Sequence, residues 1–157
     1  MFDKEMENSL QGLFVRITHQ YFVKSYHQMM NLGIHPGQLP MIRLLTFEDG
    51  LTQREIARKL NIRPPTVTVT IRRLERSGLL CRRQDEQDRR ASRISLTELG
   101  RKKSDEIKKI LKKNEEIMFE GFSESEQCLL RRFFREILDN VKKIEVEEIK
   151  GEDDIYV

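Results

Sequence analysis

The residues with the most distinctive chemistry lie in one short segment, PPTVTVTIRRLER at positions 64–76. At about 100° per residue, Val67, Ile71 and Leu74 fall on one side of a helix and predict its buried stripe. The opposite side carries Pro65, Thr66, Thr68, Val69, Arg72, Arg73 and Arg76. Threonine hydroxyls and arginine guanidinium groups bond base edges or phosphates, and valine methyls suit a thymine methyl. This side therefore has the chemistry of a surface that enters a DNA groove, and an ordinary solvated charged face is the alternative.

The residues before this segment favour the DNA interpretation, because they predict another helix and a tight turn. Thr52 and Glu55 have the spacing of a capping box, in which each side chain bonds the backbone amide of the other residue. A helix is therefore expected to begin directly after Thr52. It should end near Asn61, a residue that tolerates the left-handed conformation. Prolines fit a first helical turn, so the next helix should begin near Pro64 and end near Ser77.

Two strand-like runs, 79–83 and 93–96, follow and flank a polar stretch at 84–92. They predict a hairpin whose tip holds Asp85, Glu86, Asp88, Arg89 and Arg90. Arginines on a projecting hairpin can enter a neighbouring minor groove, whereas a charged turn without a partner is the alternative. An exposed Asp88–Arg90 ion pair would stiffen the loop by less than about 1 kcal/mol. Two helices and a hairpin describe a winged helix-turn-helix, so the predicted fold class is mainly α with a small β-hairpin wing.

These features resemble the MarR (multiple antibiotic resistance regulator) family of transcription factors over nearly the whole chain. Members of that family carry an Asp-x-Arg-Asp-Arg-Arg run, then an alternating strand and Leu-Thr-x-x-Gly. This chain has DEQDRR at 85–90, which departs only at Gln87, and LTELG at 96–100. The resemblance implies that Arg89 or Arg90 lies in the minor groove and that Asp88 helps to position it. It also implies a small phenolic or lipophilic anionic effector, bound between the dimer helices and the winged lobe.

Charge is distributed unevenly along the 157 residues. Residues 51–103 contain 15 Lys/Arg and 6 Asp/Glu, a formal charge of +9, so the remainder carries −6 within a net +3. An uneven distribution of this kind is expected when one face meets a polyanion and the other does not. Double-stranded DNA is therefore the expected partner.

Long amphipathic helices are predicted on both sides of the winged segment. Their apolar stripes are Leu10, Leu13, Phe14, Ile17 and Tyr21 near the start, and Leu130, Phe134, Ile137, Val141 and Ile144 near the end. Together with the family resemblance they favour a homodimer, and an intramolecular bundle is the alternative. We expect a single domain over 1–157, with a winged lobe at 36–97, a helical dimerisation lobe at 1–32 and 98–150, and an acidic frayed tail at 151–157.

Other functional classes find little support in the residues. The histidines have no nucleophile or carboxylate partner nearby in the sequence, and no glycine-rich signature is present, so an enzyme is not expected. Cys81 and Cys128 lack the number and spacing of a zinc or disulfide site, so no metal or cofactor is expected. No apolar run approaches the length of a membrane span, and the mixed charges of the N-terminus differ from a leader peptide. A cytoplasmic protein with no membrane partner is expected.

The expected function is that of a sequence-specific DNA-binding transcriptional regulator. We expect a repressor that binds a pseudopalindromic operator as a homodimer and is released by a small-molecule ligand. Two alternatives stay open: a helical interaction or scaffold protein, and a thiol-based redox-sensing regulator that uses Cys81.

Overall fold

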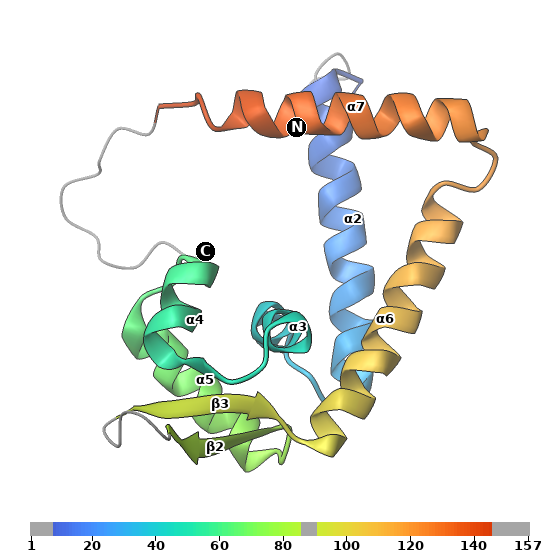
Figure 1. The fold of residues 1–157 in the computed structure, drawn as a ribbon. Helices are drawn as coiled ribbons and strands as arrows, with labels where there is room; N and C mark the ends of the chain where they lie inside the picture. Colours follow the sequence, from blue (N-terminus) through green and yellow to red (C-terminus); the bar gives the residue numbers. More distant parts are fainter. Residues whose placement is uncertain (1–7, 86–90, 146–157) are drawn as a thin grey trace, which may run out of the picture. The chain divides into compact units, whose positions relative to one another are not determined.

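The described residues between 51 and 97 form two short helices and the two strands of a hairpin, as their local signals predict (Figure 1). The computed structural model describes residues 8–85 and 91–145. The elements in chain order are α2 (Leu10–Asn31), η1 (Pro36–Gln38), α3 (Leu39–Phe47), β1 (Leu51–Thr52), α4 (Gln53–Leu60), α5 (Pro64–Arg76), β2 (Leu80–Gln84), β3 (Ser92–Leu96), α6 (Glu98–Met118) and α7 (Glu124–Val141). They belong to two compact units, residues 1–113 and 114–157.

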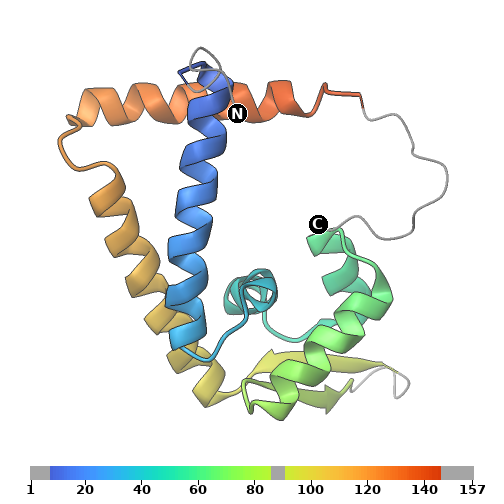
Figure 2. The ribbon, with the colours of Figure 1, turned by 180° about the vertical axis from the view of Figure 1, so that it is seen from behind.

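The described strands form an antiparallel sheet in the order β1-β3-β2. The hairpin of β2 and β3 confirms the predicted wing, whereas β1 was not predicted. Side chains alternate between the two sides of a strand, so Leu80 faces Leu96 across the hairpin on the inner side. Arg83 lies opposite Arg93 on the outer side of the same pair. The helix α5 packs along the sheet in both views (Figure 1, Figure 2).

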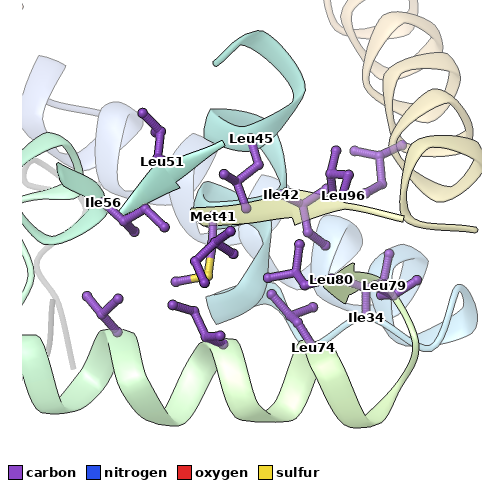
Figure 3. Close-up of a cluster of buried hydrophobic side chains, with 14 of the residues drawn as sticks. Ile34, Met41, Ile42, Leu45, Leu51, Ile56, Leu74, Leu79, Leu80 and Leu96 are labelled. Carbon is purple, nitrogen blue, oxygen red and sulfur yellow. The ribbon is translucent and has the colours of Figure 1, made fainter. Parts of the chain in front are cut away.

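The hydrophobic core of the first unit lies between α3, α4, α5 and the inner side of the sheet. Figure 3 shows Met41 and Leu45 of α3 pointing into the same interior as Leu74 of α5 and Leu80 of β2. The buried residues are Met29, Ile34, Met41, Ile42, Leu45, Leu51, Ile56, Val67, Ile71, Leu74, Leu79, Leu80, Ile94, Leu96 and Ile107. Burying one such side chain stabilises the fold by roughly 1.5–3 kcal/mol. Ile107 brings α6 into this core, and Met29 brings in the end of α2.

The second unit contains α7, which starts with its own capping box between Ser123 and Glu126. None of the α7 residues is buried. Its apolar side chains Leu129, Phe133, Phe134, Ile137, Leu138 and Val141 are all exposed. A groove of about 160 Å³ is lined by Glu115, Phe119, Gln127, Leu130, Arg131 and Phe134. Within residues 8–85 and 91–145, no helix is both long enough and apolar enough to cross a membrane.

Candidate nucleic-acid interface

The helix α5 is oriented by its buried side. Val67, Ile71 and Leu74 are each at most 1% exposed, which confirms the predicted stripe. The preceding Arg63 has the extended conformation expected before a proline, and Pro64 opens the helix at a position where an amide would have no helical partner. With one side locked into the core, the opposite side is presented at the surface.

The contact residues predicted for α5 lie on this opposite side. Pro65, Thr66, Val69, Arg72, Arg73 and Arg76 are exposed, and Thr68 is half-buried. The hydroxyl of Thr68 donates to the Pro64 carbonyl at 3.0 Å, so that hydroxyl offers a ligand its oxygen lone pairs and not its hydrogen. Val69 is 45% exposed, so its methyl groups are accessible.

The arginines of this side carry positive charge at exposed positions of α5. Within the part of the chain that the structure describes, Arg72, Arg73 and Arg76 form no ion pair. By contrast, Arg82 on the neighbouring strand β2 pairs with Glu75 at 2.6 Å. Free guanidinium groups on a locked helix are suited to phosphate oxygens and to guanine edges.

The helix α4 and the turn that leads into α5 have the predicted caps. The Glu55 amide donates to Thr52 Oγ1 at 3.3 Å, and the Thr52 amide donates to Glu55 Oε2 at 2.8 Å. The pKa of the Glu55 carboxyl lies below its ordinary 4.5, chiefly because this amide and then the Thr52 hydroxyl bond the carboxylate. Asn61 ends the helix in the left-handed conformation, with φ 52° and ψ 44°. These caps set the short connection between α4 and α5.

The base of the hairpin differs from the sequence expectation. Asp85 was expected at the exposed tip, but it is only 7% exposed at the end of β2 and pairs with Nε of Arg93. Its amide also donates to the Ala91 carbonyl at 3.0 Å, which closes the hairpin before the loop. The expectation was wrong because the strand pairing, and not the polar character of the stretch, decides where the tip begins. Asp88, Arg89 and Arg90 lie outside the described residues.

The motif Leu-Thr-x-x-Gly joins the hairpin to the end of α5. Thr97 donates its hydroxyl to the Gly78 carbonyl at 2.6 Å and its amide to the Leu79 carbonyl at 3.0 Å. The Thr97 oxygen also accepts the Gly100 amide, which caps α6. A Cβ on Gly100 would lie 2.1 Å from the Leu79 carbonyl oxygen, so only glycine fits this crossing. The first turn of α6 is therefore bound directly to the chain that leaves α5.

The two cysteines lie on different elements. Cys81 is a half-buried free thiol on β2, and Cys128 is an exposed free thiol on α7. Among the residues that the structure covers, no cluster of three or more His, Cys, Asp or Glu could hold a metal ion.

Comparison with known proteins identifies the fold. The MarR family profile matches residues 34–92. The HTH-type transcriptional regulator YwoH of Bacillus subtilis (strain 168) is 35% identical over 115 residues, which are 73% of this chain and 83% of that protein. The transcriptional repressor MdtR of the same organism is 32% identical over 103 residues, which are 66% of this chain and 64% of that protein.

A solved structure agrees with these sequence matches. The crystal structure of the MepR–DNA complex of Staphylococcus aureus superposes with a TM-score of 0.71 at 28% identity, and the match covers 88% of this chain and 99% of that one. The proteins that this chain resembles are transcriptional regulators and not enzymes. The chain belongs to the MarR family of winged helix-turn-helix transcriptional regulators.

Proposed function

We propose that this protein is a repressor that binds a pseudopalindromic operator as a homodimer. The observation that supports this most directly is the exposed side of α5, where Arg72, Arg73 and Arg76 form no ion pair with any described residue and lie beside two threonines and Val69. MepR, whose structure is similar, has been crystallised with DNA, and MdtR is named as a repressor. The proposal carries both properties over to this chain.

In the proposed complex, α5 lies in the major groove. Arg72, Arg73 and Arg76 meet guanine edges or phosphates, while Pro65, Thr66, Thr68 and Val69 approach bases and the sugar-phosphate backbone nearer the start of the helix. The hairpin lies over the flanking minor groove, with Arg89 or Arg90 as the inserted side chain and Asp88 as its support. This role for the loop rests on the sequence resemblance alone.

The homodimer is supported by apolar side chains that one copy leaves in contact with water. Leu10, Phe14 and Ile17 on α2 are exposed, and so are Phe134 and Ile137 on α7. Exposed apolar stripes of this kind, each described on its own helix, are characteristic of an interface. A twofold dimer would place the two copies of α5 in successive major grooves, with half-sites about 10 bp apart.

We further propose that a small phenolic or lipophilic anion releases the protein from its operator, as the resemblance implies. A ligand does this only if it binds the form with misplaced recognition helices more tightly than the DNA-bound form. Adding 2-hydroxybenzoate, a phenolic anion, to the isolated protein–operator complex tests this class of effector. If such an anion is the effector, operator affinity should fall as the anion occupies its site. The protein would act in the cytoplasm, where the chromosome is accessible.

The deciding experiment is selection of bound fragments from sheared DNA of the source organism, followed by titration of the most enriched fragment at two salt concentrations. Enrichment of one pseudopalindrome supports the proposal. A protein with 6–10 phosphate contacts should lose roughly 10³- to 10⁵-fold in affinity between 50 and 200 mM salt. Uniform weak retention of all fragments would refute sequence-specific binding.

Variants locate the interface on the same fragment. Arg72→Ala or Arg73→Ala should weaken binding by about 5- to 150-fold, the range expected for one bidentate base contact. Lys109→Ala is the matched control, because it removes one positive charge from an exposed position on α6. If the arginine variants and the control bind equally well, the exposed side of α5 is not the DNA-binding surface.

A further inference from the structure

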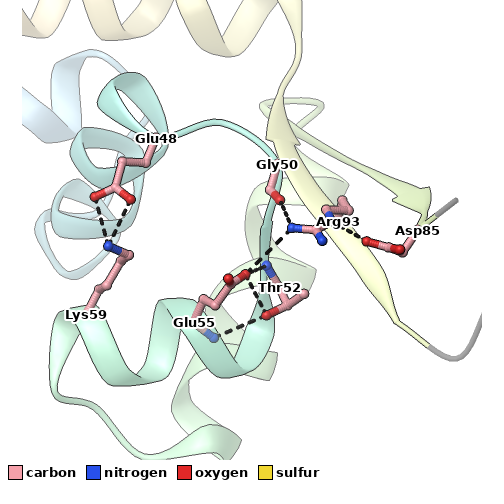
Figure 4. A network of polar contacts seen from close by, with 7 residues as sticks. All are labelled: Glu48, Gly50, Thr52, Glu55, Lys59, Asp85 and Arg93. Carbon is pink, nitrogen blue, oxygen red and sulfur yellow. Dashed lines mark hydrogen bonds and ion pairs between the residues drawn. The ribbon is translucent and has the colours of Figure 1, made fainter. Parts of the chain in front are cut away.

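One guanidinium group outside the proposed DNA-contact set connects three elements of the winged lobe (Figure 4). Arg93 lies on β3, and its Nε bonds the Asp85 carboxylate at the end of β2. Its Nη1 donates to the Gly50 carbonyl at 3.1 Å, directly before β1. The same nitrogen lies 3.9 Å from Oε2 of Glu55, in the first turn of α4. The side chain therefore links the base of the wing to the start of the helix-turn-helix.

The register of the sheet explains why a carboxylate is needed at this place. Arg83 and Arg93 lie directly opposite each other on the outer side of the hairpin, and like charges in that relation destabilise a strand pair. Asp85 directly follows β2 and lies two residues after Arg83, so its side chain continues the outer side of the hairpin. Asp85 is 7% exposed, and a buried carboxylate that loses its charged partner is costly. Asp85 and Arg93 thus depend on each other.

The shape of the arginine head makes the connection directional. The guanidinium is planar, with Nε facing Asp85 of the wing and Nη1 facing β1 and α4. Because the group is rigid, it fixes the distance between the base of the wing and the start of α4. On the α4 side it reaches the carboxylate that closes the Thr52 capping box, since Glu55 Oε2 accepts both the amide and the hydroxyl of Thr52 at 2.8 Å. A lysine ammonium lacks this planar arrangement of donors and cannot make both contacts in the same fixed geometry.

From this geometry we infer that Arg93 is a positioning residue for DNA binding. It holds the strands of the wing in place relative to α4 and α5, and it raises operator affinity without touching DNA. The inference rests on the proposed function, because it requires an operator whose major groove is contacted by α5 and whose flanks are contacted by the wing. The family motif as quoted above assigns no residue type to position 93, which lies in the alternating strand between DEQDRR and LTELG.

The test compares Arg93→Gln with wild type on the operator fragment. Affinity should fall by about tenfold, the effect of losing one hydrogen bond between charged groups. The slope of log affinity against log salt should stay unchanged, because no phosphate contact is removed. At saturating protein, hydroxyl-radical protection of the flanking minor grooves should be lost, while α5 still protects guanine N7 in the major grooves from methylation by dimethyl sulfate.

Two further variants test whether DNA binding needs the Asp85–Arg93 contact itself or only a positive charge at position 93. Asp85→Asn should reproduce the loss seen with Arg93→Gln, and the double variant should lose no more than either single one. Arg93→Lys should not restore flank protection, although it keeps the charge. Lys59→Gln is the matched control. Lys59 lies on α4 and pairs with Glu48 at 2.8 Å, so the variant removes one positive charge from an ion pair and leaves the wing contacts intact. That variant should bind as wild type does.

Several outcomes would overturn the inference. A salt slope that becomes shallower by about 0.9 per protomer would show that Arg93 contacts a phosphate itself. Full affinity in Arg93→Lys would show that charge alone suffices. If Arg93→Gln does not fold, as judged by circular dichroism, the flank protection of Arg93→Lys decides the question in its place. Failure of the wild type to select any operator would refute the proposed function instead, so the two failures are distinguishable.

Discussion

Thr52 is the residue on which the start of α4 depends, since its hydroxyl oxygen accepts the Glu55 amide at 3.3 Å. Removing such a cap typically costs about 1 kcal/mol of stability. We therefore expect Thr52→Ala to lower the free energy of unfolding by that amount in urea titrations. Thr52→Ser keeps the hydroxyl and should unfold like the wild type. An equal loss in both variants would indicate that the threonine methyl, and not the cap, carries the stability.

Glu55 makes the same cap sensitive to pH. Its pKa is lowered from the ordinary 4.5 in the folded protein, first by the Thr52 amide and then by the Thr52 hydroxyl. The stabilisation is therefore fully present above the ordinary pKa, and it is lost as pH falls through the lowered one. The unfolding free energy of wild type minus that of Glu55→Gln should be larger at pH 7 than at pH 3. A difference that is constant with pH would contradict the assignment.

Residues whose partners are close in sequence could be predicted, and residues paired across strands could not. The capping box and the left-handed Asn61 follow from spacings of a few positions, and the structure confirms both. The burial of Asp85 and its pairing with Arg93 depend on the exact strand register. A shift of one residue would place either side chain on the opposite side of its strand, so no local signal reveals the pair.

Among the elements, α6 depends on its close contact with the chain that leaves α5. Gly100→Ala would improve helix propensity by up to about 1 kcal/mol. The new Cβ would nevertheless lie 2.1 Å from the Leu79 carbonyl oxygen, and backbone must move to relieve this overlap. We expect a net destabilisation of about 1–3 kcal/mol, measured by urea unfolding. Lys109→Ala on the exposed side of the same helix is the control, and a stabilised Gly100→Ala would disprove the crossing.

The short strand β1 shows why some elements escape prediction from sequence. It has two residues, Leu51 and Thr52, which is too few for an alternating pattern. It exists because the exposed edge of β3 offers hydrogen bonds, and Leu51 pairs with Ile94 while burying its side chain in the core. The helices α4 and α5, by contrast, carry caps and periodic apolar positions within their own sequences, so their bounds were predictable.

For the whole molecule, the sequence shows which helix sides are apolar but not what covers them. Ile107 reaches the core of the first unit, whereas Ile117 and Met118 at the end of the same helix are exposed. The apolar stripe is the same kind of signal in both places. The structure is needed to tell which apolar residues of α6 are buried within one chain and which would be buried only by a partner.

The proposed dimer gives a direct test at this scale. Ile137 is 42% exposed on α7, and in a dimer Ile137→Asp would place a charge in the apolar interface of both copies. We expect the dimer dissociation constant to rise by on the order of a hundredfold or more. Analytical ultracentrifugation would measure this, and operator affinity should fall with the loss of dimer.

The matched control is Asn140→Asp, because it adds the same charge to an exposed polar position on the same helix. It should sediment as the wild type does, since a charge that stays in water carries little penalty. A monomeric Ile137→Asp with helical circular dichroism would place α7 in the interface, because the fold survives while assembly is lost. An Ile137→Asp variant that remains a dimer would exclude this stripe from the interface, and α2 would then be the surface that joins the two copies.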